Sequence, residues 1–99
     1  MLKLHVKGVD IRIQFALTPP EIPGFCFRLE RGHYFVVVNA ELTLPEKLEV
    51  IAHEAEHIKL NRNKGKVICL DKDCLRSRDN FDEWDRCFVY ELLKIVDKL

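Results

Sequence analysis

The chain has 99 residues, 47% of them hydrophobic, which is enough for residues 1–99 to form a single small domain with its own core. Sixteen basic residues balance 16 acidic ones, so the sequence predicts no concentrated basic face for binding nucleic acid. It contains no apolar run of the roughly 20 residues that span a bilayer, and its start lacks the apolar block of a signal peptide. We therefore expect a cytoplasmic protein with neither a nucleic-acid partner nor a membrane span.

The chain contains four cysteines, Cys26, Cys69, Cys74 and Cys87. They lack the two close Cys-x-x-Cys pairs of a zinc ribbon. In a cytosolic protein the expected state is four reduced, partly buried thiols. Cys69 and Cys74 enclose a short polar loop, so a local disulfide between them is an alternative that the sequence leaves open.

The N-terminal half reads as a series of strands. Alternation of polar and apolar residues predicts a half-buried strand over residues 2–17, and the Pro- and Gly-containing residues 18–24 predict a loop. Two more strands are predicted at residues 25–30 and 33–39, with Arg31-Gly32 as the tight hairpin turn between them. Together these segments predict a small, mostly antiparallel sheet.

A helix is predicted to follow this sheet. Thr43-Leu44-Pro45-Glu46 is a capping box, in which the Thr43 hydroxyl caps the first turn and Glu46 reaches back to the cap. The helix is expected to run to about Asn63, where Lys64-Gly65 ends it. Its apolar side consists of Leu48, Ile51, Ala52, Ala55 and Ile58.

Residues 66–78 read as a connecting loop, and a last helix is predicted to begin near Asp79 or Asn80 and to run almost to the C-terminus. Most of its apolar stripe is expected in the core, but the end of the helix is apolar enough to cover a cleft or a neighbouring subunit. A homodimer through this C-terminal helix is therefore an open expectation. The stripe consists of Phe81, Trp84, Phe88, Leu92, Ile95 and Leu99, widened by Cys87, Val89, Leu93 and Val96.

The motif His53-Glu54-Ala55-Glu56-His57 lies within the first predicted helix. Two histidines four residues apart project from one helix face, which places both imidazoles on a single tetrahedral zinc ion. Glu54 falls in the same sector, where a carboxylate takes a proton from the metal-bound water and passes it to the leaving amine. Such a motif also arises by chance on charged helices. Here its position after a strand, with acidic residues on a second helix, favours a metal site.

A catalytic zinc site needs a third protein ligand and one open position. Glu83 is the best candidate, because it begins the last helix, which must pack near the first. Residues 80–83 also form a capping-box pattern, in which Glu83 would only close the first turn. Asp82 and Asp85 are the alternatives. The other two histidines of the chain lie in predicted strands, where histidine is more often structural.

Residues 50–62, which contain the motif, resemble the active-site helix of gluzincin metallopeptidases. The stretch is similar to the catalytic domains of membrane peptidases such as HtpX, the CAAX prenyl peptidase and the BlaR/MecR sensors. In these a strand and a short loop precede His-Glu-x-x-His-Ile-Lys, and a downstream helix begins with Glu and an aromatic residue. Glu83-Trp84 matches that beginning, and the resemblance covers about residues 24–93. Without membrane segments, the whole is similar to a minigluzincin, the soluble minimal version of that domain.

This resemblance implies a zinc cofactor, a peptide or protein substrate, and latency in which the segment after Glu91 restricts access to the zinc. It also implies that an edge strand, residues 25–29 in this chain, binds the peptide by backbone pairing. Two positions depart from the family pattern: Arg86 stands where the family has a small residue, and Cys87 stands where it has an aspartate that supports a zinc-binding histidine. Because cysteine supports a histidine poorly, full activity is not implied.

The sequence therefore predicts an α+β fold with a small N-terminal sheet, an active-site helix and a C-terminal glutamate helix. The predicted function is a zinc metalloendopeptidase with His53, His57 and Glu83 as ligands and Glu54 as general base. One alternative is a non-catalytic zinc protein of the same fold, with Cys87 or a tail residue as fourth ligand. Another is a metal-free interaction module that dimerises through its exposed helix. The substrate-binding residues and the oxyanion-stabilising group stay open.

Overall fold

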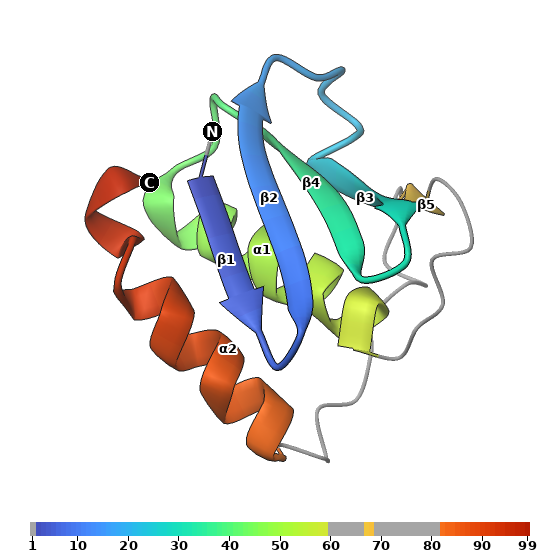
Figure 1. Cartoon of the computed structure of the whole chain (residues 1–99). Helices are drawn as coiled ribbons and strands as arrows, with labels where there is room; N and C mark the ends of the chain where they lie inside the picture. The colour runs from blue at the N-terminus through green and yellow to red at the C-terminus, as the bar shows by residue number, and fades with distance from the viewer. Residues whose placement is uncertain (1, 60–66, 69–81) are drawn as a thin grey trace.

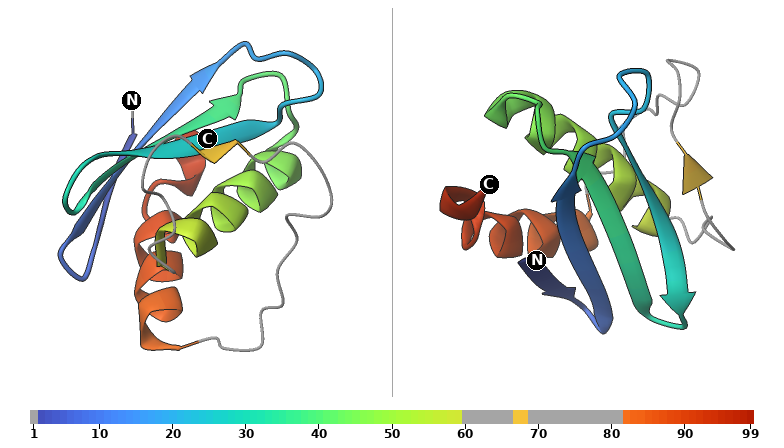
Figure 2. Two further views of the ribbon diagram at one scale, coloured as in Figure 1. Left: turned by 90° about the vertical axis from the view of Figure 1, so that its right-hand side faces the viewer. Right: turned by 90° about the horizontal axis from the view of Figure 1, so that it is seen from above.

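The computed structural model describes residues 2–59, 67–68 and 82–99. It confirms the expected α+β fold: a sheet with strand order β1-β2-β4-β3-β5, and helices α1 and α2 packed on the same face of it (Figures 1 and 2). The elements in chain order are β1 (Leu2–Val6), β2 (Val9–Ala16), β3 (Gly24–Glu30), β4 (His33–Asn39), α1 (Leu44–Lys59), β5 (Val67–Ile68), α2 (Glu83–Leu93) and the 3-10 helix η2 (Val96–Lys98).

The first predicted strand is in fact two strands. Lys7 and Gly8, with φ of 46° and 85°, form a tight turn, and β1 pairs antiparallel with β2 from Leu2↔Ile13 to Val6↔Val9. Positive φ at both central residues is typical of the two-residue turns that connect hairpin strands. The prediction of one strand over residues 2–17 was wrong because Lys-Gly is a weaker turn signal than Asn-Gly or Asp-Gly.

The second hairpin is confirmed. β3 and β4 pair antiparallel around Arg31-Gly32, where Gly32 has a φ of 78°, and a register shift interrupts the ladder between Arg28 and Glu30. β4 in turn pairs parallel with β2. The sheet is therefore mostly antiparallel, as the sequence predicted, with one parallel pair at its centre.

The core lies between the sheet and the helices. Alternate residues of the strands point into it, so that Ile11 and Ile13 are buried while Gln14 is exposed. α1 packs below β4 and β3, whereas α2 packs against β1. The buried apolar residues are Leu4, Val6, Ile11, Ile13, Cys26, Tyr34, Val36, Val38, Ile51, Ala55, Ile58, Phe88 and Leu92.

The capping box at the start of α1 is confirmed. The Thr43 amide donates to Glu46 Oε1 at 2.9 Å, and the Glu46 amide donates to Thr43 Oγ1 at 3.4 Å. Hydrogen bonds from Thr43, first from its amide and then from its hydroxyl, hold the pKa of Glu46 below its usual value. The predicted end of this helix, near Asn63 and Lys64-Gly65, lies outside the described residues.

α2 is capped differently from the expectation. Asp82 is the N-cap, and the Asp85 amide donates to Asp82 Oδ1 at 3.3 Å while the Asp82 amide donates to Asp85 Oδ2 at 3.0 Å. The reciprocal pair in the structure is therefore Asp82 and Asp85, because aspartate at the third helical position also reaches back to the cap. The predicted pair of Asn80 and Glu83 includes a residue outside the described ranges. The helix ends at Leu93, earlier than predicted, and η2 follows it. The predicted start at residues 79–80 lies outside the described residues.

Residues 66–78, predicted as a loop, contain β5 at Val67–Ile68, while Cys69 and Cys74 lie outside the described residues. Cys26 and Cys87 are reduced, the first buried and the second half-buried. Within the described ranges, no helix is both long and apolar enough to cross a membrane.

Candidate functional site

The two histidines of the motif lie side by side on α1. Their Nε2 atoms are 3.3 Å apart, and the ring centroids are 4.8 Å apart with the ring planes at 86°. Two nitrogens bound to one tetrahedral zinc ion at 2.0–2.1 Å are separated by about 3.3–3.4 Å. The spacing of His53 and His57 therefore fits two ligands of a single zinc ion.

The motif residues differ in their exposure. His57 is 4% exposed and Glu54 is 1% exposed, whereas His53 is half-buried. Glu54 and His57 belong to the face of α1 that packs under the sheet, together with Ile51 and Ile58. Packing thus fixes His57 and Glu54, and His53 is the more exposed of the two histidines.

A glycine allows α1 to lie close to the sheet at this point. A Cβ atom on Gly24 would stand 2.6 Å from Val50 Cγ1 and 2.7 Å from the carbonyl oxygen of Val37. Both separations are too short for any residue with a side chain. Gly24 therefore sets the distance between the start of β3 and the turn of α1 that precedes His53.

The outer edge of β3 is the strand edge on which the sequence predicted peptide pairing. In the structure β5 pairs antiparallel with part of this edge, at Phe25↔Ile68 and Cys26↔Val67. The stretch from Phe27 to Leu29, which belongs to the same predicted edge, is not paired with β5. The predicted peptide-binding edge is therefore partly occupied by the chain itself.

Glu83, the expected third ligand, does not lie with the histidines. Its Oε2 atom accepts from Lys7 Nζ at 3.1 Å, and its side chain is 69% exposed. This hydrogen bond and the nearby carboxylate raise the pKa of Lys7. Glu83 faces the β1–β2 hairpin, and within residues 2–59, 67–68 and 82–99 no group of three or more His, Cys, Asp or Glu side chains is arranged to hold a metal.

The two alternative ligands contact the end of α1. Lys59 Nζ donates to Asp85 Oδ2 at 2.7 Å and lies 3.4 Å from Asp82 Oδ2. The side chains of Lys59 and Asp85 are 12% and 11% exposed. The hydrogen bond to Asp85 raises the pKa of Lys59. This largely buried ion pair joins the end of α1 to the beginning of α2.

Helix geometry explains why α2 does not complete the site in this arrangement. Residues two apart in an α-helix are separated by about 200° around its axis. On α1, His57 and Lys59 therefore point in nearly opposite directions, and α2 packs on the Lys59 side. On α2, Glu83 likewise points away from the direction of Asp85, which faces α1.

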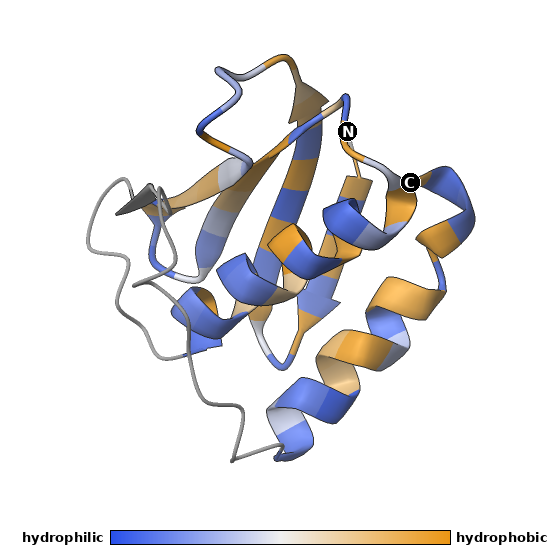
Figure 3. Cartoon of the chain, turned by 180° about the vertical axis from the view of Figure 1, so that it is seen from behind, coloured by the Kyte–Doolittle hydropathy of each residue, from blue (hydrophilic) through white to orange (hydrophobic). Residues whose placement is uncertain are grey.

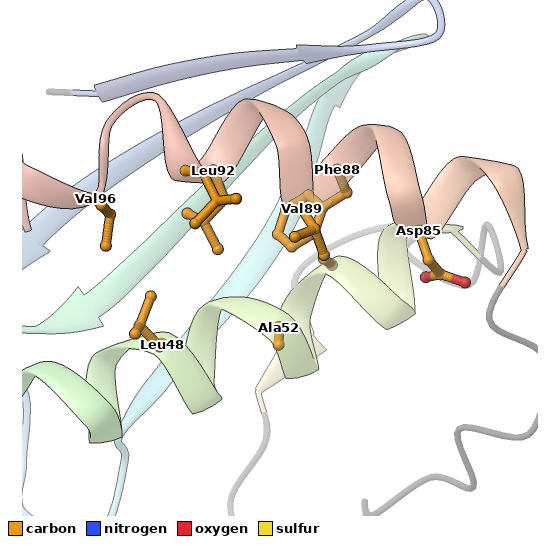
Figure 4. A pocket seen from close by; sticks show the side chains of 9 residues that line it. Leu48, Ala52, Asp85, Phe88, Val89, Leu92 and Val96 are labelled. Atoms are coloured by element: carbon orange, nitrogen blue, oxygen red, sulfur yellow. The ribbon is translucent and has the colours of Figure 1, made fainter.

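Two hollows beside α2 are lined by neither His53 nor His57. An apolar groove of about 270 Å³ separates α1 from α2 (Figure 4). It is lined by Leu48, Ala52, Ala55, Asp85, Phe88, Val89, Leu92, Leu93 and Val96. A more polar hollow of about 420 Å³ is lined by His5, Lys7, Glu83, Arg86, Cys87, Tyr90 and Glu91. Cys87, expected near the zinc ligands, thus lines the same hollow as Glu83, beside β1.

The strand histidines have structural contacts, as expected. His5 Nδ1 lies 2.6 Å from one carboxylate oxygen of Asp10, and His33 Nδ1 lies 3.4 Å from the other. The hydrogen bond with His5 holds the pKa of Asp10 below its usual value. These three residues share one register position on β1, β2 and β4, which sequence spacing alone did not reveal.

Comparison with known proteins gives one match. Residues 6–93 match the IrrE N-terminal-like domain, Peptidase_M78, a metallopeptidase-like family. The matched span contains the motif and Glu83. The match does not test the resemblance to minigluzincins. No curated protein and no solved structure is significantly similar to the chain. Because the match covers most of its length, the chain belongs to the IrrE N-terminal-like domain family of metallopeptidase-like proteins.

Proposed function

We propose that this protein is a zinc-dependent peptidase in which His53 and His57 bind the metal and Glu54 is the general base. The observation that carries the proposal is the 3.3 Å separation of the two histidine Nε2 atoms, which matches two ligands of one tetrahedral ion. Membership of a metallopeptidase-like family supports the same class of reaction. We also propose that the protein is related to the minigluzincins.

Each residue of the motif has a separate role. When bound, zinc polarises the scissile carbonyl and makes water a stronger acid. Glu54 takes a proton from the attacking water and delivers it to the departing amine, which balances the hydrolysis. Its 1% exposure keeps bulk water from competing for the carboxylate, while His57, buried beside it, holds its ring in a fixed orientation.

Glu83 is the proposed third ligand, and this role requires a change from the described arrangement. The carboxylate has to leave Lys7, and the start of α2 has to turn so that Glu83 faces α1. Both side chains are exposed, and an exposed ion pair contributes little to stability, so the contact with Lys7 is a small obstacle. Asp85 is a weaker candidate because its carboxylate already serves both Lys59 and the helix cap.

The proposed substrate is a peptide or protein in an extended conformation, bound in the cytoplasm along the outer edge of β3. Phe27 to Leu29 offer strand backbone that β5 does not pair with, and a peptide paired there would compete with β5 for the adjoining residues. Latency through the segment after Glu91 stays a prediction. That segment packs beside Leu48, about 13 Å along α1 from His57, so it restricts the histidines only if it moves.

The test is cleavage of a broad peptide library by the wild type and by Glu54→Gln. An amide cannot accept the proton, so the variant should keep its zinc and its thermal stability and lose at least about 100-fold in rate. Glu56→Gln is the matched control, because Glu56 lies on the same helix outside the proposed machinery, and it should cleave as the wild type does.

Equal rates for the wild type and Glu54→Gln would contradict the role of Glu54. Zinc binding by a wild type that cleaves nothing would instead favour a non-catalytic zinc protein of the same fold. The control separates a specific effect of Glu54 from a general effect of removing a negative charge from α1.

A further inference from the structure

Ionic contacts hold the first turn of α2 on two sides. This turn is mostly hydrophilic, whereas the later turns are largely hydrophobic where they are seen in Figure 3. On one side, Asp85 Oδ2 accepts from Lys59 Nζ of α1 at 2.7 Å, and Asp82 Oδ2 lies 3.4 Å from the same nitrogen. On the other side, Glu83 Oε2 accepts from Lys7 Nζ of the β1–β2 turn at 3.1 Å. The start of α2 is therefore held between α1 and that turn.

The two contacts differ in burial. The contact of Lys59 with Asp85 is largely buried, whereas both side chains of the Lys7–Glu83 pair are exposed. Water screens an exposed pair, but a buried carboxylate that loses its cation is left with an uncompensated charge. Asp82 and Asp85 are also the two members of the helix cap. The Lys59 contact is therefore the one that sets the orientation of the first turn.

Glu83 and Asp85 cannot face α1 at the same time. Residues two apart in an α-helix are separated by about 200° around its axis. While Asp85 is bound to Lys59, Glu83 is turned towards the β1–β2 turn and away from the helix that carries the histidines. Coordination of a metal by Glu83 therefore requires that Lys59 release Asp85.

We propose that the contact of Lys59 with Asp82 and Asp85 is a latch, which holds α2 in an orientation that keeps Glu83 out of the zinc site. This inference rests on the proposed function, because it takes Glu83 as the third ligand. A site that is complete in only a fraction of the molecules binds its ligand more weakly by that fraction. Weakening the latch should therefore strengthen zinc binding, although no ligand is changed.

Zinc affinity, measured by competition with a chelator, tests the latch. Lys59→Met keeps the apolar stem of the side chain and removes the ammonium group, so the buried carboxylate loses its partner in the latched orientation. This variant should bind zinc about three- to tenfold more tightly than the wild type. Asp85→Asn should also bind zinc more tightly, although the loss of a negative charge would by itself weaken the binding of a cation.

Two further variants separate the latch from a general effect of charge. Lys59→Met combined with Glu83→Gln should bind zinc no more tightly than Glu83→Gln alone, because release of α2 then brings no third ligand to the histidines. Lys94→Met is the matched control, since Lys94 Nζ donates to Glu91 at the other end of α2, and it should leave the zinc affinity unchanged. Thermal unfolding without zinc checks that each variant is folded.

The single tryptophan of the chain gives a second readout. Trp84 adjoins Glu83 and is half-buried, and its ring stacks on that of Phe88 with the centroids 5.7 Å apart. Zinc should shift the fluorescence of Trp84 in the wild type, because the first turn of α2 leaves its packed position. In Glu83→Gln, zinc held by the histidines alone should produce no shift.

Zinc binding by the wild type without a change in Trp84 fluorescence would overturn the latch and leave the histidine site in place. A folded Lys59→Met variant that binds zinc no more tightly than the wild type would do the same. A gain that persists with Glu83→Gln would also overturn the latch, since Lys59 would then act only through its charge. If neither the wild type nor Lys59→Met binds zinc, the proposed function fails, and the latch fails with it.

Discussion

Each histidine of α1 contributes differently to the candidate site. His57 is 4% exposed, and it cannot turn without disturbing the packing under the sheet, whereas His53 is half-buried and reaches the surface. A metal ligand held by packing loses little conformational freedom on binding. In the proposed zinc site the pair would therefore combine one fixed ligand, His57, with one more exposed ligand, His53.

The acidic side chains of α2 can be ranked by substitution. Glu83→Gln should weaken zinc binding by at least about 100-fold, because loss of even an outer partner of a metal ligand costs 10- to 100-fold. Asp85→Asn should change zinc affinity by less than about tenfold but lower stability by about 2 kcal/mol, since Lys59 then loses its charged partner. Competition with a chelator gives the affinities, and urea unfolding gives the stabilities.

The contrast between these two variants is what decides the third ligand. Asp82→Asn serves as control for the helix cap, because asparagine also accepts the hydrogen bond from the Asp85 amide. If Asp85→Asn released the zinc while Glu83→Gln retained it, Asp85 would be the ligand and the prediction for Glu83 would be wrong.

Sequence spacing predicted the histidine pair because both members belong to one helical turn. It did not predict that Glu83 contacts Lys7, since 76 residues separate them and no local pattern relates a strand turn to a distant helix. The ion pair of Lys59 with Asp85 was not predicted, for the same reason. Contacts within one element follow from its period, while contacts between elements depend on how those elements pack.

At the scale of elements, the close approach of β3 and α1 depends on Gly24. Gly24→Ala should destabilise the protein by about 2 kcal/mol, because the added methyl group meets a backbone oxygen of the neighbouring strand as well as a side chain. Thermal or urea unfolding measures the loss. Gly24 lies at the end of a predicted loop, and only the packed structure shows that it belongs to β3.

A second substitution separates the two contacts of that methyl group. Val50→Ala removes the side chain that would stand 2.6 Å from the Cβ atom of an alanine at position 24, but it leaves the Val37 carbonyl oxygen at 2.7 Å. The double variant should therefore remain less stable than Val50→Ala alone by at least about 1 kcal/mol. If Val50→Ala were equally stable with and without Gly24→Ala, the backbone at Val37 would have to shift to accommodate the added methyl group.

The two helix caps show how far local signals reach. Thr43 and Glu46 form the reciprocal bonds that the sequence predicted. At α2 the same geometry is made by Asp82 and Asp85, a pair that the preference for Glu or Gln at the third position did not select. The hairpin turn at Lys7-Gly8 was missed in a similar way. Local rules thus located most elements and misjudged those whose chemistry is less common.

At the scale of the whole molecule, the two helices pack on different strands of the sheet and have different roles. α1 lies below β3 and β4 and carries the histidines towards the β3 side, while α2 packs against β1. The groove between the helices therefore faces away from the candidate metal site.

The central claim is that His53 and His57 together hold a zinc ion, and the most direct test is the zinc content of the purified protein. The wild type should retain one zinc ion per chain after dialysis, whereas His53→Ala combined with His57→Ala should retain none. His5→Ala combined with His33→Ala is the control, because these histidines contact Asp10 instead, and it should keep the metal. Zinc retained by the first double variant at the wild-type level would contradict the account.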